Sequence, residues 1–187
     1  MNKWFWLLCL TLGWISCGEN QNEFSSTRCF LVVNNQEHNN HTLASAMTSL
    51  SPGVFCIVQQ TMKGGAPYFY FKNNYGNESY AILNAKEQRM HLIIGLNNGV
   101  IVGFDNLNQP ATFYAYDLQC PNCFDVMKIP RKSYPLTLSA NGIAICNVCH
   151  REYNLNIGGI ISKGKKGEKL IRYHATTSAP NGVLHVY

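Results

Sequence analysis

Charged side chains are scarce in this 187-residue chain, at 13% of the residues against 46% hydrophobic ones. The net charge of +5 is small, and no basic stripe alternates with the aromatic residues, so we expect no nucleic-acid partner. A G-x-S-x-G nucleophile motif, a phosphate-binding glycine loop and a recognisable carboxylate pair are also missing. The sequence therefore gives no support for an enzyme that acts alone, and leaves open a role as one component of an oxidoreductase.

A hydrophobic run long enough to span a bilayer is missing too. Residues 4–16 are apolar and follow a short positive start, and their length is that of a signal-peptide core. The run ends at Ile15-Ser16-Cys17-Gly18, which resembles a bacterial lipoprotein signal, in which the cysteine becomes the lipidated first residue. A plain secretory signal, with Cys17 an ordinary thiol, is the alternative.

The lipoprotein interpretation divides the chain into three parts. We expect a signal peptide at 1–16, a polar tether at 17–27 and one β domain at 28–187. Lipid on Cys17 would hold the protein on a membrane of the cell envelope, at the periplasmic or outer-membrane face.

Helical patterns are almost absent from the rest of the sequence. Fifteen glycines, seven prolines and an aromatic content of 12% favour short strands and tight turns. One helix is predicted, at 43–50, and Asn97-Asn98-Gly99 predicts a hairpin between strands 91–94 and 100–104. The fold class is therefore all-β, a small sandwich or barrel. The other expected strands are 28–34, 54–59, 68–72, 80–83, 112–118, 125–129, 136–138, 143–145, 153–156, 170–174 and 183–186.

Four of the cysteines form two C-x-x-C pairs, Cys120 with Cys123 and Cys146 with Cys149, separated by the 22 residues 124–145. A turn with two intervening residues places both sulfurs on one side of the backbone. Two such turns facing each other offer a tetrahedron of thiolates to a metal ion. The pattern predicts one metal site, with zinc or a single iron favoured over a [2Fe–2S] cluster.

Disulfides are the competing interpretation for an exported chain. A C-x-x-C disulfide closes a small strained ring, and the helix that follows such a motif in thiol oxidoreductases is not predicted here. Cys29 and Cys56 lie in separate predicted strands, where they could form a disulfide or remain two buried thiols.

The C-terminal part, from about residue 99 to 187, resembles Rieske-type ferredoxin domains, and especially the degenerate Rieske-like lipoproteins of Bacteroides-type bacteria. Residues 115–121 (AYDLQCP) resemble the strand and turn that enter the first ligand loop of the family. Residues 146–154 (CNVCHREYN), followed by Gly158-Gly159, resemble the second ligand loop. The segments 170–173 and 181–186 are similar to the final hairpin of the family. The resemblance implies an iron–sulfur electron-transfer module on a Rieske-like scaffold, with a redox partner protein.

The ligand set departs from that family, which takes one cysteine and one histidine from each loop. Cys120 and Cys146 match the two cysteine positions, but Cys149 stands where the second histidine is expected. In the first loop Asn122 stands at the histidine position. The histidine-ligated cluster therefore does not carry over, and we expect an all-cysteine site.

Electron transfer and a purely structural role are the two functions that these residues support. In the second, zinc or disulfides would only brace the loops of an envelope interaction protein. His150 is a candidate to tune the site from beside it, or an ordinary surface histidine. Asp117 is predicted to be a turn or strand-edge carboxylate, and Lys163, Lys165, Lys166 and Lys169 to be a solvated turn.

Overall fold

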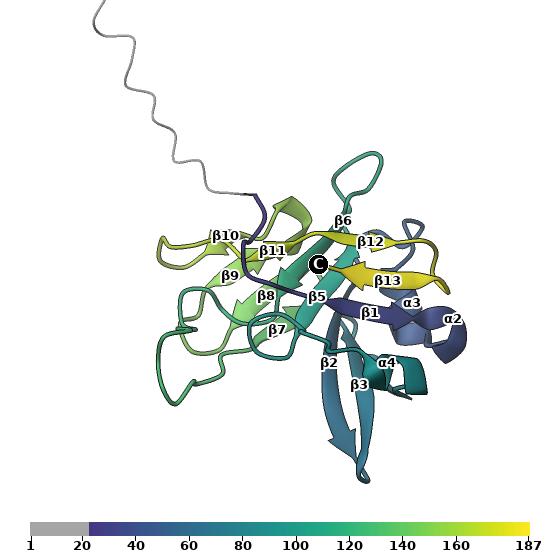
Figure 1. Ribbon diagram of the computed structural model, residues 1–187. Helices are drawn as coiled ribbons and strands as arrows, with labels where there is room; N and C mark the ends of the chain where they lie inside the picture. Colours follow the sequence, from purple (N-terminus) through teal and green to yellow (C-terminus); the bar gives the residue numbers. More distant parts are fainter. Residues whose placement is uncertain (1–22) are drawn as a thin grey trace, which may run out of the picture.

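The computed structural model describes residues 23–187, and Figure 1 shows that these residues form mainly strands. The strands are β1 (Leu31–Asn34), β2 (Phe55–Lys63), β3 (Ala66–Asn73), β4 (Glu78–Ile82), β5 (Val100–Phe104), β6 (Phe113–Asp117), β7 (Leu136–Ser139), β8 (Ile143–Cys146), β9 (Glu152–Asn154), β10 (Ile160–Lys163), β11 (Arg172–Tyr173), β12 (Ala175–Thr177) and β13 (Val183–Val186). The helical elements are α2 (Asn35–His38), α3 (His41–Ala46), α4 (Ala85–Arg89) and the 3-10 turn η1 (Leu155–Ile157). The predicted all-β class is confirmed.

The strands pair antiparallel in three sheets, and the largest sheet is the middle layer. It has six strands in the order β11-β6-β5-β2-β3-β4. Phe55 and Ile57 of β2 pack with the four-stranded sheet β10-β9-β8-β7. The intervening Cys56 and Val58 pack with the three-stranded sheet β1-β13-β12 and with α3. Because both faces are covered, β2 begins as a continuous apolar run rather than an alternating one.

The helix predicted at 43–50 forms as α3, displaced toward the N-terminus. It begins after Asn40, whose side chain accepts a hydrogen bond from the backbone N–H of Leu43. The helices α2 and α4 were not predicted, because four or five residues are too few for an apolar period to be visible. Each also begins after an asparagine, Asn34 or Asn84, that caps it with its side chain.

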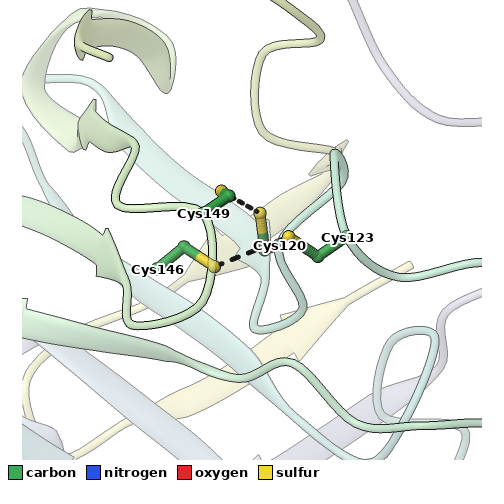
Figure 2. A group of neighbouring side chains, drawn as sticks. All are labelled: Cys120, Cys123, Cys146 and Cys149. Carbon is green, nitrogen blue, oxygen red and sulfur yellow. Dashed lines mark hydrogen bonds between the residues drawn. The ribbon is translucent and has the colours of Figure 1, made fainter. Parts of the chain in front are cut away.

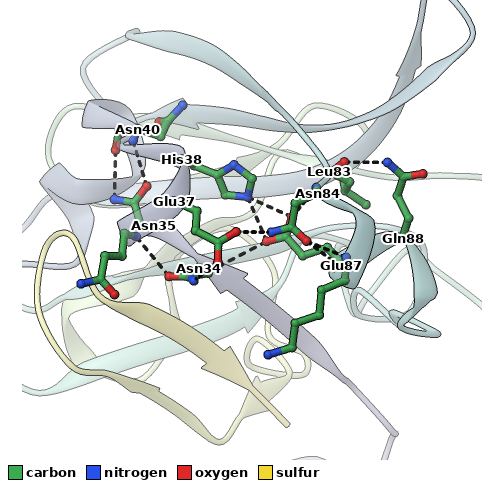
Figure 3. A network of polar contacts seen from close by, with 11 residues as sticks. Asn34, Asn35, Glu37, His38, Asn40, Leu83, Asn84, Glu87 and Gln88 are labelled. Atoms are coloured by element: carbon green, nitrogen blue, oxygen red, sulfur yellow. Dashed lines mark hydrogen bonds and ion pairs between the residues drawn. The ribbon is translucent and has the colours of Figure 1, made fainter.

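A buried hydrogen-bonded contact between His38 and Glu87 fastens α2 to α4 (Figure 3). Nε2 of His38 lies 2.9 and 3.0 Å from the two carboxylate oxygens of Glu87. The same carboxylate accepts a hydrogen bond from the backbone N–H of Asn84 and so completes a capping box. The two short helices are therefore held by side chains rather than by their own length.

Two predicted strands are wrong. Residues 91–94 make a single bridge, between Ile93 and Phe30, and the turn at Asn98 attaches instead to Gln60 of β2. The predicted hairpin is therefore absent among the described residues, and β5 pairs with β2 and β6. Residues 125–129 form turns, because the Asp125 side chain accepts from Met127 N and no strand lies alongside.

The end of the chain also differs from the expectation. The final hairpin is β12 with β13, two strands of the three-stranded sheet, and β12 was not predicted. β11 lies inside the predicted strand 170–174 but pairs with β6 in the middle sheet. β10, also not predicted, forms an edge of the four-stranded sheet.

Residues 23–27, assigned to the polar tether, contact the middle sheet. The backbone N–H of Ser25 donates to the carbonyl of Arg172 in β11, at 2.8 Å. Phe24 stacks on His174, with ring centroids 3.7 Å apart, and Glu23 pairs with the Arg172 guanidinium. Residues 1–22, with the predicted signal and lipidated Cys17, lie outside the described part of the chain. Within 23–187, no helix has the length and apolar character needed to cross a membrane.

Asp117, at the end of β6, is a buried structural carboxylate. It accepts hydrogen bonds from the backbone N–H groups of Leu96 and Gln119, at 2.6 and 2.7 Å, and from the Tyr173 hydroxyl at 2.8 Å. Burial raises the pKa of Asp117, although these three hydrogen bonds oppose the rise. Its contacts fix the backbone just before Cys120.

Replacing Asp117 with Ala should lower the free energy of unfolding by about 2–4 kcal/mol, because three donors lose their acceptor. Urea unfolding followed by circular dichroism measures the change. Asp125→Ala, which removes a half-exposed carboxylate a few residues away, is the control and should change stability by less than about 0.5 kcal/mol. Equal midpoints for the two variants would contradict the structural role of Asp117.

Candidate metal centre

The first cysteine pair lies in the turn that follows β6. The backbone N–H of Cys120 donates to the carbonyl of Tyr134, at 2.9 Å, which fixes the start of the turn. The carbonyl of Cys120 then accepts from the N–H groups of Cys123 and Phe124, at 3.1 and 2.9 Å. This double acceptance closes a tight turn, named knuckle 1 (Cys120–Cys123), with both sulfurs on one side.

The second pair lies between β8 and β9. Cys146 ends β8, and its carbonyl accepts from the N–H of His150 at 2.9 Å. The N–H of Cys146 donates to the carbonyl of Arg151, at 3.0 Å. His150 takes a left-handed backbone conformation, with φ of 57°, that lets the chain return into β9. This turn is named knuckle 2 (Cys146–Cys149).

The four sulfur atoms converge between the knuckles, as Figure 2 shows, and all lie within 4.8 Å of one another. Sγ of Cys120 is 3.7 Å from Sγ of Cys149, and Sγ of Cys123 is 3.8 Å from Sγ of Cys146. In a tetrahedron with metal–sulfur bonds of about 2.3 Å, the sulfurs lie about 3.8 Å apart. The donor set and its spacing therefore fit one thiophilic ion bound by both loops.

All six cysteines of residues 23–187 are free thiols in the structure. The closest sulfur pairs are nearly twice as far apart as the bond of about 2.05 Å in a disulfide. Cys29 and Cys56 are separate buried thiols, and the disulfide considered between them is not formed. Burial raises the pKa of Cys29 to about 11 and raises that of Cys56 further.

The thiols of the two knuckles differ in how readily they ionise. Burial raises the pKa of Cys120 to about 11, and burial with the neighbouring sulfurs raises that of Cys123. Burial also opposes ionisation of Cys149. Hydrogen bonds from the backbone and guanidinium of Arg151 and contacts with Cys123 and Cys146 outweigh it, and lower that pKa to about 6. A cation would have to displace the protons of the more resistant thiols.

Tyr153 and Asn122 contact the site, and neither was predicted from the sequence to have a role beside it. The Tyr153 hydroxyl lies 3.2 Å from Sγ of Cys120 and accepts a hydrogen bond from the Asn122 side chain, at 2.9 Å. Asn122 stands at the position where the family resemblance places a histidine ligand. Its side chain contacts the Tyr153 hydroxyl beside the cluster instead of a sulfur. In the sequence, the one indication of these contacts was a tyrosine in the predicted strand that follows the second cysteine pair.

His150 lies beside the cluster but is exposed, and its side chain makes no hydrogen bond to a sulfur within the described residues. Its contribution here is the backbone conformation described above. The neighbouring Arg151, not singled out from the sequence, helps to lower the pKa of Cys149.

Comparisons of the chain with protein-family models, with curated proteins and with solved structures found no match.

In metal-free, reduced protein, we expect iodoacetamide to label Cys149 about tenfold faster than Cys123 near pH 7.5. Both side chains are half-buried, so the difference in thiolate population should decide the rate. Peptide mapping by mass spectrometry over time measures both rates. Lowering the pH through 6 should slow labelling of Cys149, because its thiolate is lost there. Equal rates at Cys123 and Cys149 would contradict the assigned order of ionisation.

Proposed function

We propose that this protein binds one metal ion, most simply iron, through Cys120, Cys123, Cys146 and Cys149, and that the ion transfers electrons in the cell envelope. The observation that carries the proposal is the convergence of four sulfurs within 4.8 Å. Four thiolates stabilise both oxidation states of a single iron without any further ligand.

The sulfur spacing favours one ion over a [2Fe–2S] cluster. A two-iron cluster binds two sulfurs on each iron and separates those two pairs by the width of the cluster. Here the shortest sulfur contacts, 3.7 and 3.8 Å, both join one knuckle to the other, and no sulfur lies beyond 4.8 Å from another. The histidine-free ligand set also removes the feature that raises the potential of Rieske centres.

The exposure of the site supports exchange of electrons with a partner. Cys120 and Cys146 are buried, whereas Cys123 and Cys149 are half-buried, so an ion would be shielded on one side and near the surface on the other. The resemblance of both ligand loops to those of Rieske-type domains supports the same role, on a Rieske-like scaffold. The lipoprotein-like junction at Cys17 supports attachment to the envelope membrane, near a redox partner.

A structural zinc ion is the second candidate. The observation that favours it is that the sulfurs connect two loops with little regular structure, the segments before β7 and after β8. An ion there would restrict the conformations of both loops, and this role needs no change in the oxidation state of the ion.

Protein purified without oxygen should contain about one iron per chain and absorb visible light through sulfur-to-iron charge transfer. Elemental analysis with an absorption spectrum tests this directly. One zinc per chain in a colourless protein would overturn the electron-transfer proposal in favour of the structural one. Two disulfides without metal, detected by mass spectrometry, would overturn both.

Cys123→Ser should remove most of the bound metal, because it replaces one of four thiolates. Cys56→Ser is the matched control: it also removes a free cysteine, but one buried in the core away from the cluster, so metal content per folded chain should stay unchanged. Loss of metal from both variants, or from neither, would contradict the assignment of the ligands.

A further inference from the structure

The segment between β10 and β11 is a basic loop held by Asn122 of knuckle 1 and by Arg151, which lies just beyond knuckle 2. This loop, defined here as the basic loop (residues 164–169), carries Lys165, Lys166 and Lys169. None of the three forms an ion pair with another described residue, whereas Lys163 before them pairs with Glu152. The sequence predicts a solvated turn here, but one side chain of knuckle 1 and one side chain just beyond knuckle 2 fix its backbone.

Knuckle 1 holds the loop through Asn122. The Asn122 amide donates to the carbonyl of Glu168 at 2.7 Å, and its side-chain oxygen accepts from the Glu168 N–H at 2.9 Å. These two bonds imitate the pairing of one strand with another. The adjacent Gly167 leaves the necessary room, since a Cβ there would lie 2.1 Å from the Asn122 side-chain oxygen.

Arg151, two residues after knuckle 2, holds the same loop. Its guanidinium donates to the carbonyls of Lys165 and Lys166, at 2.9 and 3.2 Å. Gly164 lies against Arg151, where a Cβ would come within 3.2 Å of its backbone.

We propose that the metal centre controls a docking surface for an acidic protein segment, formed by the basic loop and β10. The inference rests on the proposed binding of a metal, although not on which metal binds. Asn122 lies between two ligands and Arg151 lies two residues after a third, so the contacts of both side chains with the basic loop require the knuckles to be closed. An empty site releases the cross-knuckle restraint and loosens the three lysines.

The chemistry of the surface determines the partner. A hollow of about 430 Å³ lies between β10 and the basic loop, with Ile160 and Ile161 at one side and Lys166 and Lys169 at the other. β10 is an edge strand, so its outer backbone groups are free to pair with an extended chain. A strand of Asp or Glu residues with apolar side chains between them complements both features.

Hydrogen exchange and peptide binding together test the proposal on the full chain, with metal content measured for every sample. In the metal-loaded protein, residues 164–169 should exchange slowly, and chelation should raise their exchange by at least about tenfold while β2 and β5 stay protected. A labelled poly-glutamate peptide should bind the loaded protein about tenfold more tightly than the chelated one, and less tightly as salt rises.

Asn122→Ala separates the clamp from the metal. It removes both bonds to Glu168 and the bond to the Tyr153 hydroxyl, but none of the four ligands. Because the thiolates remain, metal content should persist while exchange of the loop rises and peptide binding weakens. Asn147→Ala, the matched change at an exposed position of knuckle 2, should alter neither. Equal behaviour of the two variants, with metal retained, overturns the inference and leaves the proposed function standing. A wild-type chain without metal overturns the proposed function instead, and with it the control by metal.

Charge is tested by a matched pair of triple variants. Lys165→Gln, Lys166→Gln and Lys169→Gln together should abolish peptide binding and keep the metal. Lys128→Gln, Arg131→Gln and Lys132→Gln remove the same number of charges from the loop after knuckle 1, and should weaken binding less than about twofold. Equal losses in the two triple variants would show a general effect of net charge and overturn the assigned surface.

Discussion

Burial of the middle sheet on both faces is the constraint on which the rest of the structure depends. β5 and β2 present side chains to a sheet on either side, so their register cannot slip without exposing one apolar set and burying a polar one. β6, paired beside β5, is fixed in the same way and ends at the buried Asp117. The first cysteine turn begins three residues later, so the core, rather than the cysteines themselves, fixes its position.

Strands with a distinctive local composition could be predicted from the sequence. β2, β3 and β5 are dense in β-branched and aromatic residues and end at clear turn formers, and their existence and type were correct. Residues 91–94 and 125–129 have a similar local composition but lack a neighbouring strand. Pairing is a tertiary property, and no local pattern reports it.

The ligand set was predictable for a different reason. The turn geometry of C-x-x-C fixes two sulfurs within a few residues, so only the meeting of the two turns had to be inferred. The groups around the sulfurs come from distant segments. Arg151 and Asn122 form hydrogen bonds to a loop that lies some 14 and 46 residues later in the chain, respectively. Nothing in their local sequence indicates these contacts. Asn34 and Asn84, which cap two helices of one turn each, were missed because a cap is informative only when a periodic helix follows it.

Residues 23–25 are attached to β11. This attachment limits the distance between the β domain and a membrane to which Cys17 is anchored. Glu23 and Ser25 line the same hollow as Pro121 of the first cysteine turn. With the predicted lipid on Cys17, only five residues lie between that cysteine and Glu23 at the hollow, a reach of at most about 20 Å. A protein that exchanges electrons with this centre would then have to meet it at the level of the lipid headgroups, which favours another membrane-bound protein over one that diffuses freely.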